Sequence, residues 1–170
     1  MLDLNQIIDR MRANADAITA LARDVSDAQA RWKPSADARS LLEVMNHLYD
    51  EEREDFRTRI DYMLHRPGEQ APPIDPEGWV TARSYNQRDP RESLAAFLRE
   101  RDSSLEWLHG LHDPNWDAEY HAPWGVLRAG DLLVAWLAHD HLHLRQLNEL
   151  HYAYLAQQAA PYSVAYAGDW

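Results

Sequence analysis

Residues 137–146 read Leu137-Ala-His139-Asp-His141-Leu-His143-Leu-Arg-Gln146, and they place His139 and His143 four residues apart in a strongly helical pattern. Side chains with this spacing lie on one face of an α-helix. The face continues in both directions at alternating intervals of four and three residues, through Leu132, Trp136, His139, His143, Gln146 and Leu150. This rhythm is typical of the inward stripe of a bundle helix. Buried imidazoles need polar partners, and a metal ion bound by both is the natural candidate.

Three further helices are predicted, over residues 4–25, 40–64 and 90–111, and the helix with the histidine pair is expected from about residue 130 to residues 154–157. The first repeats the bundle rhythm at Leu4, Ile8, Met11, Ala15, Ile18, Ala22 and Val25. Ser40-Leu-Leu-Glu43 has the pattern of a capping box, and Asp89-Pro90 has that of a helix start. No alternating strand pattern lies between these segments. The sequence therefore predicts an all-α fold, a four-helix bundle.

Two connections interrupt the helices. Residues 67–90 carry five prolines and two glycines, which favours a long loop between the second and third helices, with a short helical turn at Trp79–Tyr85. The second loop precedes residue 130, and we expect it to include a small hairpin. The tail, residues 160–170, lacks periodicity, but its aromatic residues indicate that it packs on the bundle.

Composition limits the function further. The length of 170 residues suits one domain, residues 1–170, and no apolar run approaches the roughly 20 residues that span a bilayer. Without a signal-like N-terminus, we expect a soluble, cytoplasmic protein that does not bind membranes. The net charge of −11 and the absence of clustered basic residues disfavour nucleic acid. Cysteine is absent, so a transition metal has to be held by His, Asp, Glu or water.

A catalytic zinc site usually has three protein ligands and an open position, so the histidine pair needs a third ligand. His47 is the candidate, because an antiparallel neighbouring helix would bring it opposite the pair. Its helical angle, however, separates it from the apolar face around Met45. Either this helix buries two faces, or His47 is exposed. Glu51, one turn further on, is a candidate general base, ligand or hydrogen-bond acceptor for an imidazole, against the alternative of an exposed acidic face.

Other polar residues have less specific signals. Arg101 lies on the apolar stripe of the third helix, where it could bind an anionic ligand, although we favour a side chain that reaches solvent along the helix edge. Asp140 and His141 are expected to face outward. The last helix has no Glu three residues before either histidine of the pair, as a carboxylate-bridged di-iron bundle would require. The pattern therefore favours a single metal ion.

Together these segments resemble the DinB/YfiT-like family of metal-binding four-helix bundles. The resemblance rests on the pattern of the first helix and on four motifs: Ser26-Asp-Ala-Gln29 before Trp32-Lys-Pro34, the segment Ser40-Leu-Leu-Glu-Val-Met-Asn-His47-Leu48, Asp131-Leu-Leu, and His139-x-x-x-His143-x-x-Gln146. It implies that His47, His139 and His143 bind one divalent metal, zinc or nickel. The family includes thiol S-transferases that use bacillithiol or mycothiol, a mycothiol-dependent maleylpyruvate isomerase, and proteins described as metal-dependent hydrolases.

The resemblance implies a metal-dependent enzyme of the thiol S-transferase or hydrolase type that acts on a small-molecule substrate. A metal lowers the pKa of a bound thiol or water, so a chain without cysteine fits thiol chemistry if a low-molecular-weight thiol is the cofactor. Whether the protein is an enzyme stays open. The alternatives are a non-catalytic bundle that binds a metal or small ligand, and a metal-free core with hydrogen-bonded histidines. A catalytic metal should face a pocket lined by some of Trp79, Tyr85, Arg101, Trp124 and Trp136. The apolar tail and the resemblance are compatible with a homodimer.

Overall fold

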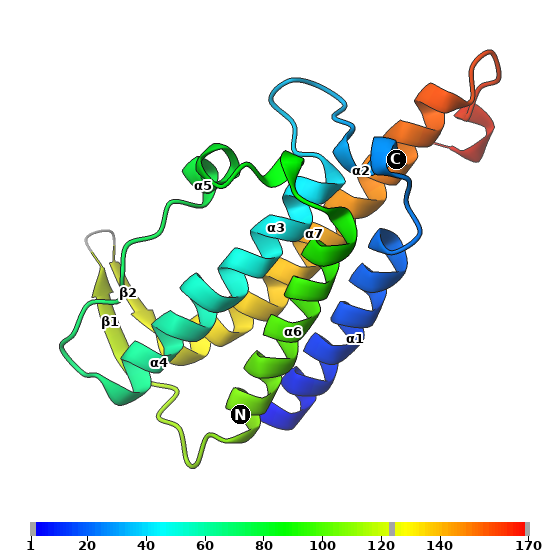
Figure 1. The fold of residues 1–170 in the computed structure, drawn as a ribbon. Coiled ribbons are helices and arrows are strands. Elements are labelled where there is room, and N and C mark those ends of the chain that lie inside the picture. Colours follow the sequence, from blue (N-terminus) through cyan, green and yellow to red (C-terminus); the bar gives the residue numbers. More distant parts are fainter. Residues whose placement is uncertain (1–2, 123–124, 169–170) are drawn as a thin grey trace.

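Long helices form most of the structure, a computed structural model that describes residues 3–122 and 125–168. The helices are α1 (Leu4–Ala22), α2 (Asp27–Arg31), α3 (Leu41–Asp50), α4 (Arg57–His65), α5 (Pro76–Ala82), α6 (Pro90–His109) and α7 (Ala129–Gln158). A π-helical segment, Glu51–Phe56, joins α3 to α4 without a break. Short 3-10 turns occupy Tyr85–Gln87 and Ala165–Ala167, and β1 (Glu119–Ala122) pairs antiparallel with β2 (Gly125–Arg128). The predicted all-α bundle is confirmed (Figure 1).

The helix starts follow from local side-chain chemistry. Ser40 accepts a hydrogen bond from the backbone N–H of Glu43, whose carboxylate accepts one from the Ser40 backbone, so the predicted capping box is present. Asp89 caps α6 ahead of Pro90. These caps satisfy backbone N–H groups that have no partner within the helix. The predicted starts of both helices are therefore correct to within one residue.

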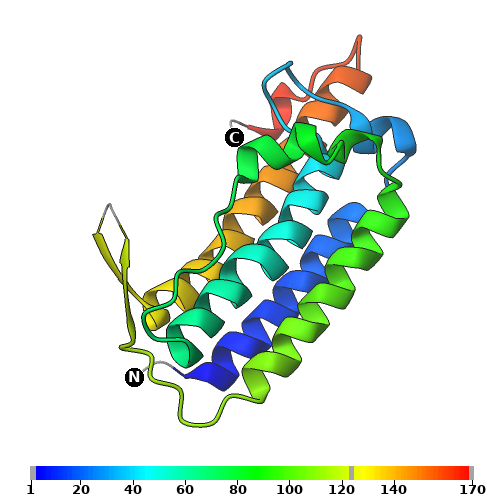
Figure 2. The same ribbon diagram turned by 60° about the vertical axis from the view of Figure 1, so that its left-hand side comes forward.

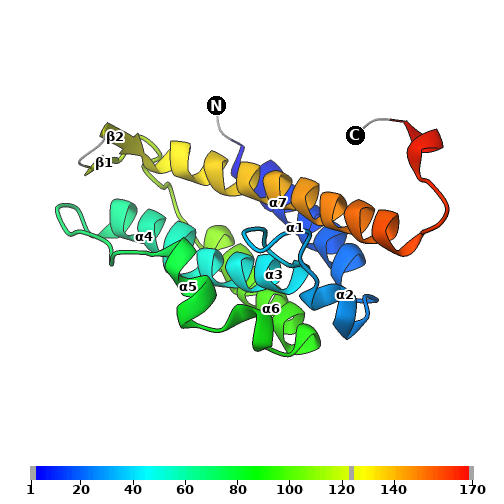
Figure 3. The ribbon, with the colours of Figure 1, turned by 90° about the horizontal axis from the view of Figure 1, so that it is seen from above.

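The order of the helices around the bundle differs from their order in the sequence. α1 packs against α6 and α7, and the continuous α3–α4 helix packs against the same two neighbours, so α1 and α3 occupy opposite corners. Figure 3 shows α6 and α7 on opposite sides of the bundle. α1 and α7 run in one direction, whereas α3–α4 and α6 run in the other (Figure 1). α3 and α7 are therefore antiparallel neighbours, as a site shared by His47 and the histidine pair requires.

This topology explains the long connection between α4 and α6. The two helices run in the same direction, so the chain must return along the whole bundle before α6 begins. Figure 2 shows residues 66–75 running along the outside of the bundle to α5 and the other end. α5 starts at Pro76, capped by Asp75, three residues before the expected turn at Trp79. The returning segment lies over the bundle beside α3 and α4.

A polar layer divides the core into two apolar halves. One half includes Ile8, Met11, Ile60, Leu108 and Trp136, and the other includes Ile18, Met45, Phe97, Leu147 and Leu150. Between them along the helices lie four buried polar side chains, one from each long helix: Asn14, Glu52, Arg101 and Asp140. Because buried polar groups are costly unless paired, this layer marks the level of the bundle where a functional site is expected.

Two peripheral segments complete the fold. The expected hairpin is present between α6 and α7, and its tip, residues 123–124, lies outside the described residues. The tail does not pack on the bundle as expected: Tyr162 and Tyr166 are 83% and 105% exposed. The described part of the tail continues past the end of α7 (Figure 1), and Trp170 lies outside the described residues. Among the described helices, none combines the length and the apolar character needed to cross a membrane.

Candidate metal centre

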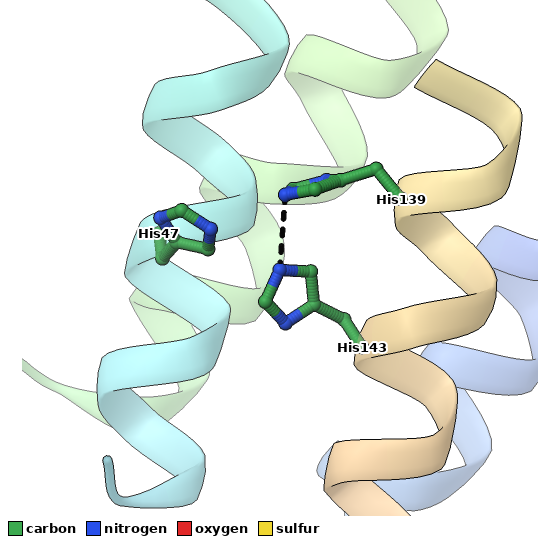
Figure 4. Close-up of side chains that lie close together, drawn as sticks. All are labelled: His47, His139 and His143. Atoms are coloured by element: carbon green, nitrogen blue, oxygen red, sulfur yellow. Dashed lines mark hydrogen bonds between the residues drawn. The ribbon is translucent and has the colours of Figure 1, made fainter. Parts of the chain in front are cut away.

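Three histidines converge at the seam between α3 and α7. One ring nitrogen from each of His47, His139 and His143 lies within 4.8 Å of those of the other two. His47 and His143 are buried, at 6% and 8% exposure, and His139 is half-buried. Figure 4 shows His47 on α3 facing the pair on α7. The structure thus brings together the three side chains predicted as ligands.

The histidine pair on α7 presents its ring nitrogens to a common point. His143 Nδ1–H donates a hydrogen bond to Gln146 Oε1 at 2.8 Å, which leaves the lone pair on His143 Nε2. That atom lies 3.0 Å from His139 Nε2. Two nitrogens that bind one zinc ion at tetrahedral angles lie about 3.3 Å apart, given the usual zinc–nitrogen bond length. A small spread of the two rings would therefore admit an ion.

His47 and Glu51 contain buried polar atoms that lack partners. His47 Nδ1 and Glu51 Oε1 are both buried without a hydrogen bond, and they lie 3.9 Å apart. A carboxylate beside the second nitrogen of an imidazole is the usual outer partner of a metal-bound histidine. Unsatisfied buried atoms are rare in folded proteins and call for an explanation. A metal ion on the opposite nitrogen of His47 would fix the proton on Nδ1, which faces the Glu51 carboxylate, so the residues present fit a bound metal.

Burial keeps the ligand set neutral. Desolvation, followed by the proximity of His143, lowers the pKa of His47 to about 2. Desolvation likewise lowers the pKa of His139 to about 3 and lowers that of His143. The pKa of Glu51 rises to about 8 because of burial and then of the neighbouring Asp55. Neutral imidazole is the form that binds a metal, so the site needs no deprotonation near neutral pH.

The second helix buries two faces, which places both His47 and Glu51 inside. Every residue from Ser40 to Leu48 is buried, and the π-helical segment that follows buries Glu51, Glu52, Asp55 and Phe56. The exposed acidic face considered for Glu51 is therefore wrong. The reason is that α6 and α7 cover this helix on two sides while α5 packs against it on a third. Segments of π-helix are often found at functional sites.

Arg101 and Asp140 are buried, which corrects the expectation that they face solvent. Arg101 is 1% exposed and Asp140 is 0% exposed. The guanidinium donates to both oxygens of Glu52 at 2.7 and 2.9 Å, to both of Asp140 at 2.9 and 2.7 Å, and to the backbone oxygen of Met11 at 2.9 Å. Asn14 also donates to Asp140, at 3.2 Å. The network ties together all four long helices.

The network adjoins the histidine cluster through the chain itself. Glu52 follows Glu51, and Asp140 follows His139. The position of Arg101 on an apolar stripe was the signal in the sequence, because a buried guanidinium requires acidic partners. Nothing in the pattern indicated which acids these were. By holding Glu52 and Asp140, the network fixes the backbone on both sides of the candidate site.

A groove of about 530 Å³ opens beside His143. Arg39 from the segment before α3, Glu77 of α5, and His143 and Gln146 of α7 are among the residues that line it. His143 is thus the ligand candidate with direct access to a cavity. An approaching small molecule would meet Arg39 in the same groove.

Within the described part of the chain, none of the expected Trp and Tyr side chains lines this groove. Trp136 is buried and donates its indole N–H to Glu52 at 3.0 Å. Tyr85 is buried and donates its hydroxyl to Asp50. Trp124 lies outside the described residues. Trp79 is half-buried and packs against the guanidinium of Arg83. Trp136 and Tyr85 serve the core because their polar atoms find acidic partners there, which a count of aromatic residues does not reveal.

The comparisons with known proteins agree with this architecture. The sequence profile of the DinB superfamily matches residues 10–147. A solved structure that is similar to this chain is YfiT from Bacillus subtilis, described as a probable metal-dependent hydrolase with an unusual four-helix bundle topology. It shares 18% sequence identity, with a TM-score of 0.76 over 86% of this chain and 85% of that chain, which shows a common fold. A search of curated proteins gives no match. Because the profile spans most of its length, the chain belongs to the DinB superfamily.

Proposed function

We propose that this protein holds one divalent metal ion with His47, His139 and His143, and that it is an enzyme of the hydrolase or thiol S-transferase type acting on a small molecule. One observation carries the proposal. Three imidazoles converge, and within residues 3–122 and 125–168 no fourth His, Asp or Glu joins the cluster. Structural zinc sites are closed by four protein ligands, whereas catalytic sites have three and an open position. The donor set supports a catalytic centre.

The chemistry assigns separate tasks to the residues around the ligands. A bound zinc or nickel ion would lower the pKa of a water or thiol. Gln146 keeps the proton on His143 Nδ1, so that Nε2 is free to bind. Glu51, buried 3.9 Å from the Nδ1 atom of His47, is our candidate general base. The chain has no cysteine, so a reacting thiol would come from a low-molecular-weight cofactor.

Metal content tests the ligand set. Protein purified without a His-tag should contain about one zinc or nickel ion per chain by elemental analysis, or bind one with high affinity. His143→Ala should abolish stoichiometric binding. His141→Ala is the matched control, because His141 lies on the same helix but is exposed. A wild-type protein without metal or metal affinity, or unchanged binding by His143→Ala, would refute the assignment.

The open position is tested with cobalt in place of the native metal. Cobalt(II) bound by nitrogen ligands should change its visible absorption when a thiol binds. A thiolate charge-transfer band that appears only in the metal-loaded protein would support the transferase form of the proposal. Hydrolysis of model esters or amides that requires the metal would support the hydrolase form. A spectrum unaffected by thiols, together with unfolding on chelation and no hydrolysis, would indicate a structural metal.

A cytoplasmic location and a homodimer stay predictions from the sequence.

A further inference from the structure

We propose that Arg39 is the anion-binding subsite of this centre, and that it selects small molecules with a carboxylate at a distance from the group that reacts. The inference rests on the proposed function, because it assumes that the substrate reaches the metal. It adds a substrate class to that function. The supporting observations are the low exposure of Arg39 in the groove, the weakness of its present ion pair, and its electrostatic reach.

Arg39 is less exposed than any of the acids that line the groove with it. Its side chain is 15% exposed, and it lines the groove together with His143. Of the acids in its lining, Glu77 is 87% exposed, Asp37 is exposed as well, and Glu149, 37% exposed, forms an ion pair with Arg145. A desolvated guanidinium interacts with an anion more strongly than solvated carboxylates repel it. The part of the groove beside Arg39 therefore favours a negative group.

The ion pair of Arg39 can be replaced by a ligand. One guanidinium nitrogen donates to Glu77 Oε1 at 2.6 Å. A pair with such an exposed partner contributes little to stability. Glu77 belongs to the seven-residue helix α5, which lies between two irregular segments. A guanidinium carries five N–H donors in a planar fork that matches a carboxylate with two parallel hydrogen bonds. A substrate carboxylate could thus take the place of Glu77.

The charge of Arg39 affects the pKa of all three histidines and of Glu51. Burial is the main reason that the pKa of each histidine is lowered, and Arg39 lowers all three further. It also opposes the rise in the pKa of Glu51. Because Arg39 and His143 line the same groove, the guanidinium can bind one end of a small molecule there while the other end contacts the histidine cluster. The substrate class is a short chain with a carboxylate and a reactive group or thiol.

The first experiment measures thiol binding to cobalt-loaded protein by visible absorption. The probes are straight-chain mercapto carboxylic acids of increasing length, each paired with the mercapto alcohol of the same length. At one or more lengths the acid should bind about tenfold more tightly than its alcohol, as expected for a charge-assisted hydrogen bond. Arg39→Gln should abolish this preference, and Glu77→Gln should increase it because the competing carboxylate is removed. Arg12→Gln is the control with the same change in charge, on an exposed side chain of α1.

The results separate this inference from the proposed function. If acids and alcohols both bind and no length shows a preference, or if Arg39→Gln retains the preference, the Arg39 subsite is wrong and the open position stands. If no thiol alters the cobalt spectrum, the transferase form of the proposed function is refuted, and metal-dependent hydrolysis decides the hydrolase form. Arg39 is then judged by a second measurement, the nuclear magnetic resonance shift of its Nε–H on addition of butyrate. A saturable shift that is larger in Glu77→Gln supports the subsite, and no shift overturns it.

Discussion

Replacing Arg101 by Met should destabilise the bundle severely, because it removes the only cation in the described part of the central polar layer. The guanidinium makes five hydrogen bonds to Glu52, Asp140 and Met11. Its loss would strand two carboxylates that are 1% and 0% exposed. Breaking a buried ion pair from one side costs about 3–5 kcal/mol. For a chain of 170 residues this lowers Tm by roughly 6–20 °C.

The assay is urea unfolding followed by circular dichroism, with a chelator present so that metal binding does not contribute. Arg12→Met is the control, because Arg12 and Asp9 form an ion pair with 55% and 75% exposed side chains. It should cost less than about 1 kcal/mol. Adding Glu52→Gln and Asp140→Asn to Arg101→Met should restore much of the stability, because no unpaired charge remains. A loss for Arg101→Met as small as that of the control would refute the reasoning.

Two further predictions concern the site. Gln146→Leu should weaken zinc binding about 10- to 100-fold, because His143 loses the acceptor that orients it. Competition with a chromogenic chelator measures the affinity for zinc, and Asn148→Ala on the same helix is the control. Equal affinities of Gln146→Leu and the wild type would contradict the prediction. Glu51→Gln tests the raised pKa in metal-free protein: the unfolded chain loses the Glu51 proton near 4.5 and the folded chain near 8, so the stability of wild type relative to the variant should fall between these pH values and then level off. A difference in unfolding free energy that does not vary with pH would contradict this prediction.

The sequence was sufficient for the features that depend on one helix at a time. The spacing of His139 and His143 places both at the site, and the capping residues Ser40 and Asp89 mark helix starts that the structure confirms. These signals are local, because neighbours on a helix face and cap hydrogen bonds involve residues within four positions of each other. Family resemblance supplied His47, for which helical spacing alone left two alternatives.

Features that depend on several helices were either predicted wrongly or not predicted at all. Asp140 lies to one side of the apolar stripe of α7, about 80° from its centre at 100° per residue, and it is buried because α1 and α6 meet it from that side, with Asn14 and Arg101 as partners. A helix in the corner of a bundle has two neighbours, so its buried arc is wider than one apolar stripe. The π-helical segment also escaped prediction, since Glu51–Phe56 reads as an ordinary acidic helix turn. Its buried acids find partners only after the bundle is assembled.

Because of the returning connection, the shape of the groove can change without a change in the geometry of the histidines. The metal-binding candidates lie on α3 and α7, which are held by the core, whereas Glu77 of the groove belongs to the segment that leads from α4 back to α6. Insertions and substitutions are tolerated in surface connections far better than in packed helices. Variation in this one segment can therefore remodel the groove while the histidines keep their geometry. Such an arrangement would let a single bundle serve many substrates across its superfamily, with the connection as the variable part.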